Sequence, residues 1–331
     1  MITIGIDVSK LSLDVFIKEE CKSKKIKNQY ETIIKTMEEM GDCKVFYEAT
    51  GVYSQTLCKA LNDLKIEHYQ LHPTNVHLLA KGLGERNKND KIDAKRIAEI
   101  GELLYESGIN TLIKPNSNTI NLIQSNLGRI YSLKQMRVKL LQQIDKEKND
   151  PYKNELMMDF YQSQVTRHDE VIKEIYKQIK SLLEKEGLEN KLKNMESVPG
   201  IHENVGIDLI GFFLKLKEKG IKKDEIAKVK AYSGLDCSQQ QSGTSLNKAG
   251  ISKRGNSKIR RSLYMASVGW YQMIKNNKYS GTVLGQFFLR MRRKFESNAN
   301  KRGKSVMCAM GKKLLITSWA IFWNDTKYNY C

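Results

Sequence analysis

Met1-Ile2-Thr3-Ile4-Gly5-Ile6-Asp7-Val8-Ser9 opens the chain and has the β-branched, apolar character of a strand buried within a sheet. One carboxylate, Asp7, stands in the middle of it. A lone charge in an apolar strand is costly to bury unless a partner neutralises it, and a divalent metal ion is the usual partner. The stretch therefore predicts a core strand that carries a metal ligand.

Three further carboxylates are candidates for the same role. Glu48 follows the apolar run 45–47 at the end of a second predicted strand, and Asp90 and Asp93 stand three residues apart where a helix is expected to begin. Each has a plainer explanation: Asp90 as a helix N-cap, Asp93 as a first-turn acid that offsets the helix dipole, and Glu48 as an exposed strand end. Together with Asp7, these acids from three elements predict a metal site.

The rest of the N-terminal part alternates strands and helices. Residues 2–8 and 13–17 predict two antiparallel strands joined by a short turn. The pattern then predicts, in order, a helix over 30–40, a strand over 45–48, a helix over 53–64, a strand over 66–71, a short helix from Pro73 and a helix over 90–104. This order predicts an α/β domain over residues 1–115, which ends at the polar break 114–118.

Two long amphipathic helices are expected next. Apolar residues recur every three or four positions from Ile120 to Ile144, stop at Asn149-Asp150-Pro151, and resume from Ile172 to Leu182. This pattern predicts an antiparallel coiled-coil hairpin over residues 116–192. Such a hairpin is either a spacer or an oligomerisation arm.

The C-terminal part, residues 193–331, predicts a mainly helical domain. The turn Ser197-Val198-Pro199-Gly200-Ile201 between two helices is typical of helix-hairpin-helix elements, which present backbone N–H groups to a phosphate. Residues 236–255 lack periodicity and predict a long mobile loop. A basic helix is expected to follow, with Lys258, Arg260 and Arg261 on its outer face and Ile259, Leu263, Ala266 and Trp270 on its inner face.

The net charge of this 331-residue chain is +19, with a pI near 9.5. Such a balance points to a polyanionic partner, either nucleic acid or an anionic membrane surface. No apolar run approaches the roughly 18 residues of a membrane span, and the chain starts on a strand rather than a signal peptide, so we expect a cytoplasmic protein that does not enter a membrane. The six cysteines are scattered without metal-ligand spacing and predict reduced thiols.

The basic residues concentrate towards the C-terminus. Residues 237–313 contain 17 Lys or Arg residues and one acid, Glu296. We expect this region to contact nucleic-acid phosphates, which gives affinity and salt dependence but little sequence recognition. The candidate contacts are Lys253, Arg254, Lys258, Arg260, Arg261, Arg290, Arg292, Arg293, Lys294, Lys301 and Arg302.

Four carboxylates in a basic protein fit metal-assisted phosphodiester chemistry. In two-metal sites, a pair of divalent ions about 3.5 to 4 Å apart clamps the attacking and leaving oxygens. Asp and Glu oxygens suit the hard cation Mg²⁺, or Mn²⁺ in its place.

Several motifs give the chain a specific resemblance. Gly5-Ile6-Asp7-Val8-Ser9-Lys10, Tyr47-Glu48-Ala49-Thr50-Gly51-Val52-Tyr53, His72-Pro73 and Asn89-Asp90-Lys91-Ile92-Asp93-Ala94 resemble the RuvC-like DEDD domain of insertion-sequence 110 family transposases. Val198-Pro199-Gly200-Ile201, Tyr232-Ser233-Gly234-Leu235, Gln241-Ser242-Gly243 and Ile251-Ser252-Lys253-Arg254-Gly255-Asn256 with Arg260-Arg261 are similar to the second domain of that family, in the same order.

The resemblance implies an RNase H-like (RuvC-like) fold for the first domain and a DNA recombinase activity. It places Asp7, Glu48, Asp90 and Asp93 at the Mg²⁺-binding acids and Ser242 at the nucleophilic serine, with Ser238 and Ser245 close by in the sequence. It further implies a structured non-coding bridge RNA that pairs with donor and target DNA. Because no His neighbours Ser242, its activation is expected from the metal site across domains or subunits.

Three hypotheses of different classes stay open. The first is a serine-dependent, metal-assisted, RNA-guided recombinase that works as a homodimer or homotetramer. The second is an RNase H-like nuclease or Holliday-junction resolvase that cuts with activated water and leaves Ser242 idle. The third is a nucleic-acid-binding protein that keeps the fold without cutting. An actin-like ATPase also opens on such a strand, but no second Gly-rich phosphate loop follows.

Overall fold

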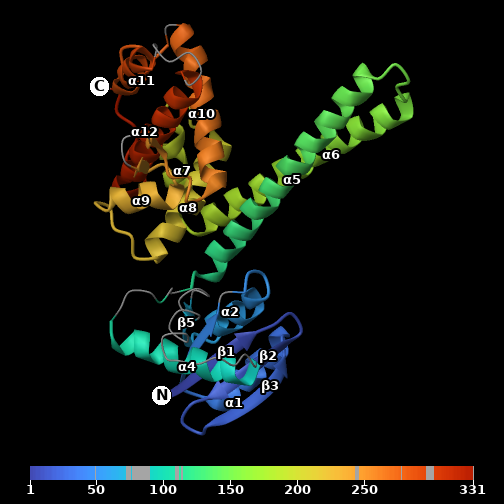
Figure 1. Ribbon diagram of the computed structural model, residues 1–331, viewed down its shortest axis with the longest axis vertical. Helices are drawn as coiled ribbons and strands as arrows, with labels where there is room; N and C mark the ends of the chain where they lie inside the picture. The colour runs from blue at the N-terminus through green and yellow to red at the C-terminus, as the bar shows by residue number, and fades with distance from the viewer. Residues whose placement is uncertain are drawn as a thin grey trace. The chain divides into compact units, whose positions relative to one another are not determined.

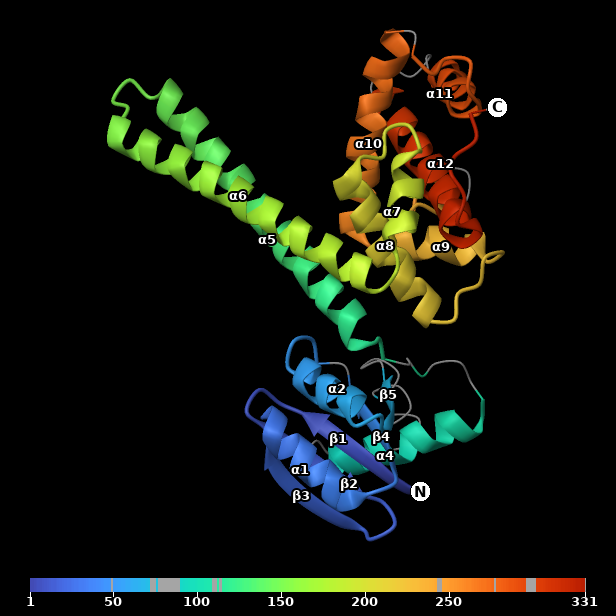
Figure 2. The same ribbon diagram turned by 180° about the vertical axis from the view of Figure 1, so that it is seen from behind.

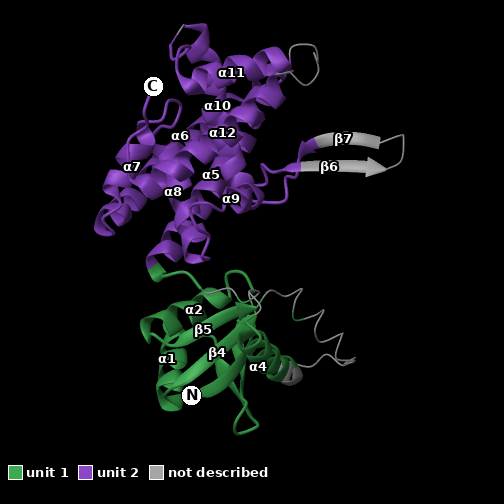
Figure 3. Ribbon diagram, turned by 90° about the vertical axis from the view of Figure 1, so that its left-hand side faces the viewer, with its two compact units in different colours: residues 1–118 green, residues 119–331 purple. Residues whose placement is uncertain are grey.

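The computed structural model describes residues 1–48, 50–71, 76, 90–108, 112, 115–242, 246–276, 278–295 and 302–330. By its internal contacts the chain forms two compact units, Met1–Asn118 and Thr119–Cys331 (Figure 3). The hairpin and the C-terminal part, which the sequence analysis separates at residue 192, share one hydrophobic core in the second unit, because Ile123 and Ile179 pack in the same cluster as Leu263 and Trp319.

A mixed five-stranded sheet forms the centre of the first unit. Its strands are β1 (Ile2–Val8), β2 (Ser12–Ile17), β3 (Lys22–Lys27), β4 (Cys43–Glu48) and β5 (Glu67–Leu71), in the order β3-β2-β1-β4-β5. β1, β2 and β3 pair antiparallel, whereas β4 pairs parallel to β1 and β5 parallel to β4. The nine residues that open the chain therefore supply the middle strand.

Helices cover both faces of this sheet. α1 (Tyr30–Met40) and α2 (Ser54–Asp63) pack on the face that carries Ile4, Ile6 and Val45, the apolar side of the strand alternation (Figure 2). α4 (Asp90–Glu106) packs on the opposite face (Figure 1). The predicted strands and helices of this unit are confirmed, apart from the short helix at Pro73, which falls outside the described residues.

Close backbone approach fixes the position of α4. A Cβ atom on Gly5 would lie 2.2 Å from the carbonyl oxygen of Ala94 and 2.5 Å from the amide nitrogen of Ala98, so only glycine allows this helix to lie on β1. Towards the other end of α4, the Thr3 hydroxyl donates to Glu102 Oε1 over 2.9 Å. α4 therefore runs antiparallel to β1, and its N-terminus lies near the C-terminal ends of β1 and β4.

The second unit is helical. α5 (Asn118–Asn149) and α6 (Glu155–Lys185) form the long hairpin (Figure 1), and the packed helices are α7 (Glu189–Glu196), α8 (Glu203–Glu218), α9 (Ile226–Ser233), α10 (Ser257–Lys275), α11 (Val283–Lys294) and α12 (Arg302–Asn324). The helical hairpin is as predicted, whereas its coiled-coil geometry stays a prediction. α7 and α8 are joined through the Pro199-Gly200 turn, where Gly200 has a φ of +87°.

The prediction of a long mobile loop over residues 236–255 was wrong. Residues Cys237–Ser242 and Leu246–Ile251 form the antiparallel strands β6 and β7. The edge strand β3 was also missed, because its sequence is almost entirely lysine and serine and only Ile26 is buried. Both omissions concern strands whose sequences are largely polar or small, so that no apolar pattern marks them.

α12 corrects a further expectation, that no segment approaches the length and apolarity of a membrane span. Gly303–Asn324 passes that test by length and composition alone. More than half of this segment is buried inside the unit, where Met310, Leu314 and Trp319 form its core. A buried core helix passes the same test, so we regard α12 as the central helix of the second unit.

Candidate functional site

Strand register brings the first two predicted acids together. β1 and β4 pair in parallel through Gly5 with Phe46 and Ile6 with Tyr47, so Asp7 and Glu48 take the next position on both strands. Neighbouring residues at equivalent positions on paired strands project from the same face. Gly5 and Phe46 contact α4, and the alternation therefore places Asp7 and Glu48 on the α4 face at the C-terminal edge of the sheet.

The N-terminus of α4 lies near this edge and carries the other two acids. Asp93 is half-buried and accepts a bond of 3.1 Å from Nη1 of Arg96, whose own side chain is only 12 % exposed. The backbone of Asp90 begins the helix, whereas its side chain falls outside the described residues. All four predicted acids thus come from elements that meet at one edge of one sheet face.

A fifth carboxylate, Asp14, belongs to this face and was missed in the sequence analysis. Asp14 pairs directly with Asp7 across β1 and β2 and with Lys25 across β2 and β3. It is 7 % exposed, and its Oδ2 lies 3.1 Å from the Lys25 ammonium group. The sequence placed Asp14 in a strand, but only the register of the turn at residues 9–12 shows which residue it opposes.

The donor chemistry of this edge suits a hard divalent cation, since carboxylate oxygens are the ligands that Mg²⁺ prefers. Asp7, Glu48 and Asp93, with Asp90, are the residues that would hold it. Among the side chains that the structure describes, no three acids, cysteines or histidines lie together in a ready metal cluster. The gathering of all four acids around one ion therefore stays a prediction.

The predicted nucleophile lies in the second unit. Ser242 is the last residue of β6 and pairs with Leu246, so it stands beside the tip of the β6–β7 hairpin. The side chains of Ser238 and Ser242, and Ser245 as a whole, fall outside the described residues. The assignment of Ser242, rather than Ser238 or Ser245, as the nucleophile therefore stays a prediction.

Most of the predicted phosphate contacts are exposed. Those with exposed side chains are Lys253, Arg254, Lys258, Arg261, Arg290, Arg292, Arg293 and Lys294, whereas the side chains of Lys301 and Arg302 fall outside the described residues. Arg260 is a correction to the expected outer face of α10. It is half-buried and donates from Nη1 to the Ser233 carbonyl oxygen over 2.9 Å, so it has a structural role.

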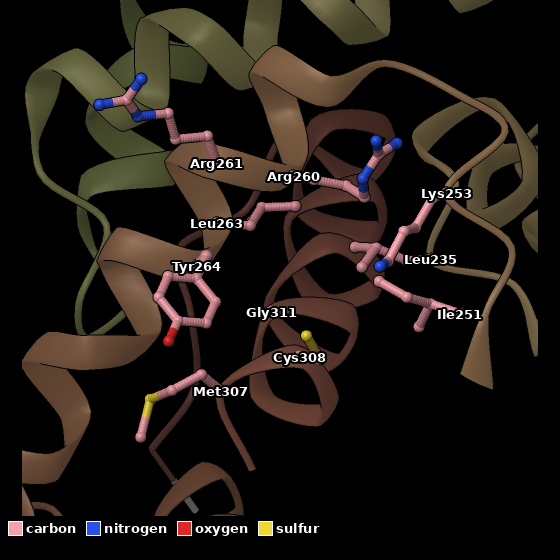
Figure 4. Close-up of a pocket in the computed structure, with 10 residues that line it drawn as sticks. All are labelled: Leu235, Ile251, Lys253, Arg260, Arg261, Leu263, Tyr264, Met307, Cys308 and Gly311. Atoms are coloured by element: carbon pink, nitrogen blue, oxygen red, sulfur yellow. The ribbon is translucent and has the colours of Figure 1, made fainter. Parts of the chain in front are cut away.

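A pocket lies where the end of β7 meets α10 and α12 (Figure 4). Leu235, Ile251, Leu263 and Met307 give it an apolar lining, and Lys253 and Arg260 lie on one side of it. Burial raises the pKa of the Cys308 thiol in this pocket, although the charges of Lys253 and Arg260 oppose the shift. Cys308 is therefore a packing residue rather than a reactive thiol.

A buried polar network in the second unit was not predicted from the sequence. Asp208 of α8 accepts bonds from the hydroxyl of Ser262 at 2.5 Å and from the hydroxyl of Tyr176 at 3.3 Å. Tyr176 in turn accepts a bond of 2.9 Å from the ammonium group of Lys134. Burial raises the pKa of the Asp208 carboxyl, against the opposing effects of Ser262 and Lys134. The network links α5, α6, α8 and α10 through this one acid.

Comparison with known proteins places this geometry in context. Residues 4–147 match the family model of a DEDD transposase domain, described as "Transposase", and residues 192–280 match the model described as "Transposase IS116/IS110/IS902 family". The chain is also 25 % identical over 281 residues to the pilin gene-inverting proteins of Moraxella bovis and Moraxella lacunata. Each alignment covers 83 % of this chain and 78 % of the relative.

Proposed function

This chain belongs to the insertion-sequence 110 family of transposases, enzymes that act on DNA, and on that basis we propose that it cuts and rejoins DNA with a serine nucleophile assisted by a divalent metal ion. The observation that carries the proposal is the register of β1 and β4, which puts Asp7 and Glu48 side by side at the edge where α4 begins. A match to the DEDD domain over the same residues supports a metal role for these acids.

We assign the first unit to the RNase H-like class. Three antiparallel strands followed by two parallel strands, each reached through a helix that crosses one face, support this assignment. In such a sheet the ligand site lies at the C-terminal ends of the parallel strands, where Asp7 and Glu48 stand. The position of the carboxylates thus agrees with the fold class.

Asp7, Glu48, Asp90 and Asp93 would hold Mg²⁺ or Mn²⁺. When bound, such a cation polarises the phosphate and favours charge build-up on its oxygens. The protein's own contribution is to fix the acids on rigid elements: two on adjacent strands and two in the first turn of a helix held against β1 by Gly5.

Ser242 acts as the nucleophile in this proposal. Its Oγ attacks the scissile phosphorus, so that a serine O–P bond forms as the P–O bond to one sugar oxygen breaks. The serine proton leaves as attack proceeds, and the released sugar oxygen takes up a proton. The phosphoserine link conserves the energy of the broken bond. A second sugar hydroxyl then loses its proton and attacks the phosphorus, so that a sugar O–P bond forms as the serine O–P bond breaks, and the released Ser242 oxygen takes up a proton.

The basic surface of the second unit would hold the substrate and its guide. Lys253, Arg254, Lys258, Arg261, Arg292, Arg293 and Lys294 are exposed and suited to phosphate contacts with donor DNA, target DNA and a bridge-type non-coding RNA. The relatives are named as proteins that invert a pilin gene, which supports rearrangement of specific DNA segments as the outcome. We further propose a homodimer or homotetramer that works in the cytoplasm on the nucleoid.

Replacement of Ser242 tests the chemistry. Ser242→Ala should abolish both recombination and the covalent protein–DNA adduct recovered after denaturation, whereas Ser238→Ala, on the same strand, serves as the matched control and should retain both. Strand exchange that survives in Ser242→Ala would favour the RNase H-like nuclease, in which activated water cuts the DNA.

Two further measurements separate the remaining alternatives. Asp7→Asn should remove cleavage while nucleic-acid affinity stays within a few-fold of the parent, because Asp7 is assigned to the metal and not to phosphate contacts. A protein that only binds nucleic acid would show no cleavage in the parent either. RNA recovered with the purified protein should be a specific structured transcript. Random fragments would indicate only general affinity for polyanions.

A further inference from the structure

Three lysines of the second unit lie near one another, and none of them forms an ion pair among the described residues. Lys215 and Lys219 stand one turn apart at the end of α8, and both are half-buried. Lys258 lies in the first turn of α10, with its ammonium group close to Gly128 of α5. α8 contacts α10, and Figure 1 shows the two helices side by side.

The electrostatics of these lysines are unfavourable in the protein alone. Burial lowers the pKa of Lys215, and the charge of Lys258 lowers it further. Burial likewise lowers the pKa of Lys219, with a further contribution from Lys215. The three charges therefore repel one another in a row from Lys258 through Lys215 to Lys219.

No ion pair within the described part of the chain offsets this repulsion. Among the described residues, none of the three lysines forms an ion pair, whereas other lysines of the same unit do, such as Lys193 with Glu189 at 2.6 Å and Lys228 with Glu225 at 2.5 Å. Asp208, two turns before Lys215 on α8, attracts Lys258, but its charge is shared with Lys134 and its oxygens are bound by Ser262 and Tyr176. Partly desolvated cations with so little opposing charge are costly unless an anion completes the arrangement.

Aromatic rings accompany the lysines. The ammonium group of Lys258 lies 5.2 Å from the ring centroid of Tyr131, and that of Lys219 lies 5.8 Å from the ring centroid of Tyr232. Tyr232 is 43 % exposed, which leaves part of its ring open. Cations interleaved with exposed aromatic rings are typical of grooves that hold a nucleic-acid backbone and stack its unpaired bases.

We propose that Lys258, Lys215 and Lys219 form a lysine track that binds consecutive phosphates of a nucleic-acid strand, with Tyr232 stacking on an unpaired base. The inference rests on the proposed function and adds a surface to it, because Lys215, Lys219 and Tyr232 were not among the predicted contacts. A single small anion would not engage a row of cations that extends over α10 and α8. A phosphodiester backbone presents charges in such a row.

The test compares two double variants of the full chain. Lys215→Gln with Lys219→Gln removes two charges of the track. Lys173→Gln with Lys177→Gln removes two exposed lysines at the same spacing on α6, and neither lysine forms an ion pair within the part of the chain that the structure describes. Affinity for labelled single-stranded RNA and single-stranded DNA is measured by fluorescence anisotropy over a range of salt concentrations.

The track variant should bind roughly tenfold more weakly than the parent, and its log affinity should depend less steeply on log salt by about 1.4, because each phosphate contact on a single strand contributes about 0.7. The α6 variant should keep the parent slope. A loss on RNA alone assigns the track to RNA, a loss on DNA alone assigns it to DNA, and a loss on both indicates a shared backbone contact. Equal slopes in the parent and the track variant would overturn the proposal.

Folding and the wider function are checked separately. The track variant should melt at or above the temperature of the parent, because removal of like charges relieves repulsion. Lys215→Arg with Lys219→Arg keeps both charges and should retain most of the parent affinity. This variant shows that the loss in the glutamine variant comes from the missing charges. A parent protein that binds neither RNA nor DNA would refute the proposed function itself, whereas a parent that binds while the track variant is unaffected refutes only the track.

Discussion

Asp7 and Asp14 oppose each other directly across β1 and β2, so that two carboxylates share one position on the face that α4 covers. Like charges at directly opposed positions destabilise a sheet unless a cation is near. Lys25 on the edge strand β3 supplies that cation at 3.1 Å from Asp14. The row of Lys25, Asp14, Asp7 and Glu48 across four adjacent strands makes the site sensitive to every charge within it.

The first prediction concerns Lys25→Met. Loss of the ammonium group leaves Asp14, whose side chain is 10 % exposed, beside Asp7 without its partner. We expect a loss of about 1 to 2 kcal/mol in the free energy of unfolding, measured by urea denaturation. Added Mg²⁺ should stabilise this variant more than the parent, because a cation at the adjacent acids replaces the missing charge.

Lys24→Met is the matched control on the same strand. Lys24 pairs with Glu39 at 3.5 Å, and both side chains are more than half exposed, so its loss should cost less than about 0.5 kcal/mol. The double variant Lys25→Met with Asp14→Asn should recover much of the stability lost in Lys25→Met. The explanation fails if Lys25→Met and Lys24→Met are equally stable.

Gly5→Ala is the second prediction. The new methyl group would lie 2.2 Å from the Ala94 carbonyl oxygen and 2.5 Å from the Ala98 amide nitrogen, and both atoms belong to the backbone of α4. We expect destabilisation of about 3 kcal/mol or more and displacement of the helix that carries Asp90 and Asp93. Urea denaturation reports the stability, and titration with Mn²⁺ by calorimetry reports the site.

Gly303→Ala provides the comparison, because nothing lies within 4 Å of its added Cβ and its φ is not positive. This variant should be as stable as the parent or more stable by up to about 1 kcal/mol. Normal stability and Mn²⁺ binding in Gly5→Ala would show that α4 is not held by this close approach.

Sequence patterns predicted the elements that bury a run or a stripe of apolar side chains. β1 and β4 were found because Ile4, Ile6 and Val45 face a core, and α4 because Ile97, Ile100 and Leu104 share one side. β3 was not predicted because an edge strand is commonly rich in lysine and buries few side chains, and in β3 only Ile26 is buried. β6 and β7 were missed because their sequences, CSQQQS and LNKAGI, show no apolar alternation, and only the structure reveals that they pair with each other.

The candidate site was predictable in composition but not in register. Asp7 was recognisable as a charge in an apolar strand, and Glu48 as an acid at a strand end. Asp14 was not recognised, since a carboxylate in a strand becomes significant only when its cross-strand neighbour is known to be Asp7. The network around Asp208 depends on residues from four helices and has no local sequence signal.

The third prediction concerns thiol reactivity. Iodoacetamide at about pH 8 should label the exposed Cys21 and Cys237 long before Cys43, since the thiolate is the reactive form. Cys43 is 3 % exposed, and burial raises the pKa of its thiol to about 11. Peptide mapping by mass spectrometry follows each site.

The same shift has a consequence for stability. The folded pKa of Cys43 exceeds the ordinary value of 9.0, so the neutral thiol stabilises the folded state. This contribution to the free energy of unfolding is fully present below pH 9 and is lost as the pH rises towards about 11. A Cys43→Ala control should show a weaker decline in stability over that range. Rapid alkylation of Cys43 in the native protein would contradict the buried position.

The last prediction is that Asp208→Asn stabilises the protein at neutral pH. Burial raises the pKa of Asp208, so the folded state holds the carboxylate less readily than water does, although Ser262, Lys134 and Tyr176 oppose the shift. A raised carboxyl pKa means that stability falls as the pH rises from the ordinary value near 3.8 through the folded value. Asparagine keeps an oxygen acceptor for Ser262 without the charge, so its advantage over the parent should appear at neutral pH and shrink as the pH falls and Asp208 takes up its proton. Thermal melting of both proteins over a pH series measures the difference.

Asp208→Ala should be destabilising at every pH, because it leaves the Ser262 and Tyr176 hydroxyls without their acceptor. A constant offset between Asp208→Asn and the parent over the whole series would mean that Asp208 does not titrate within it and that burial does not control its charge.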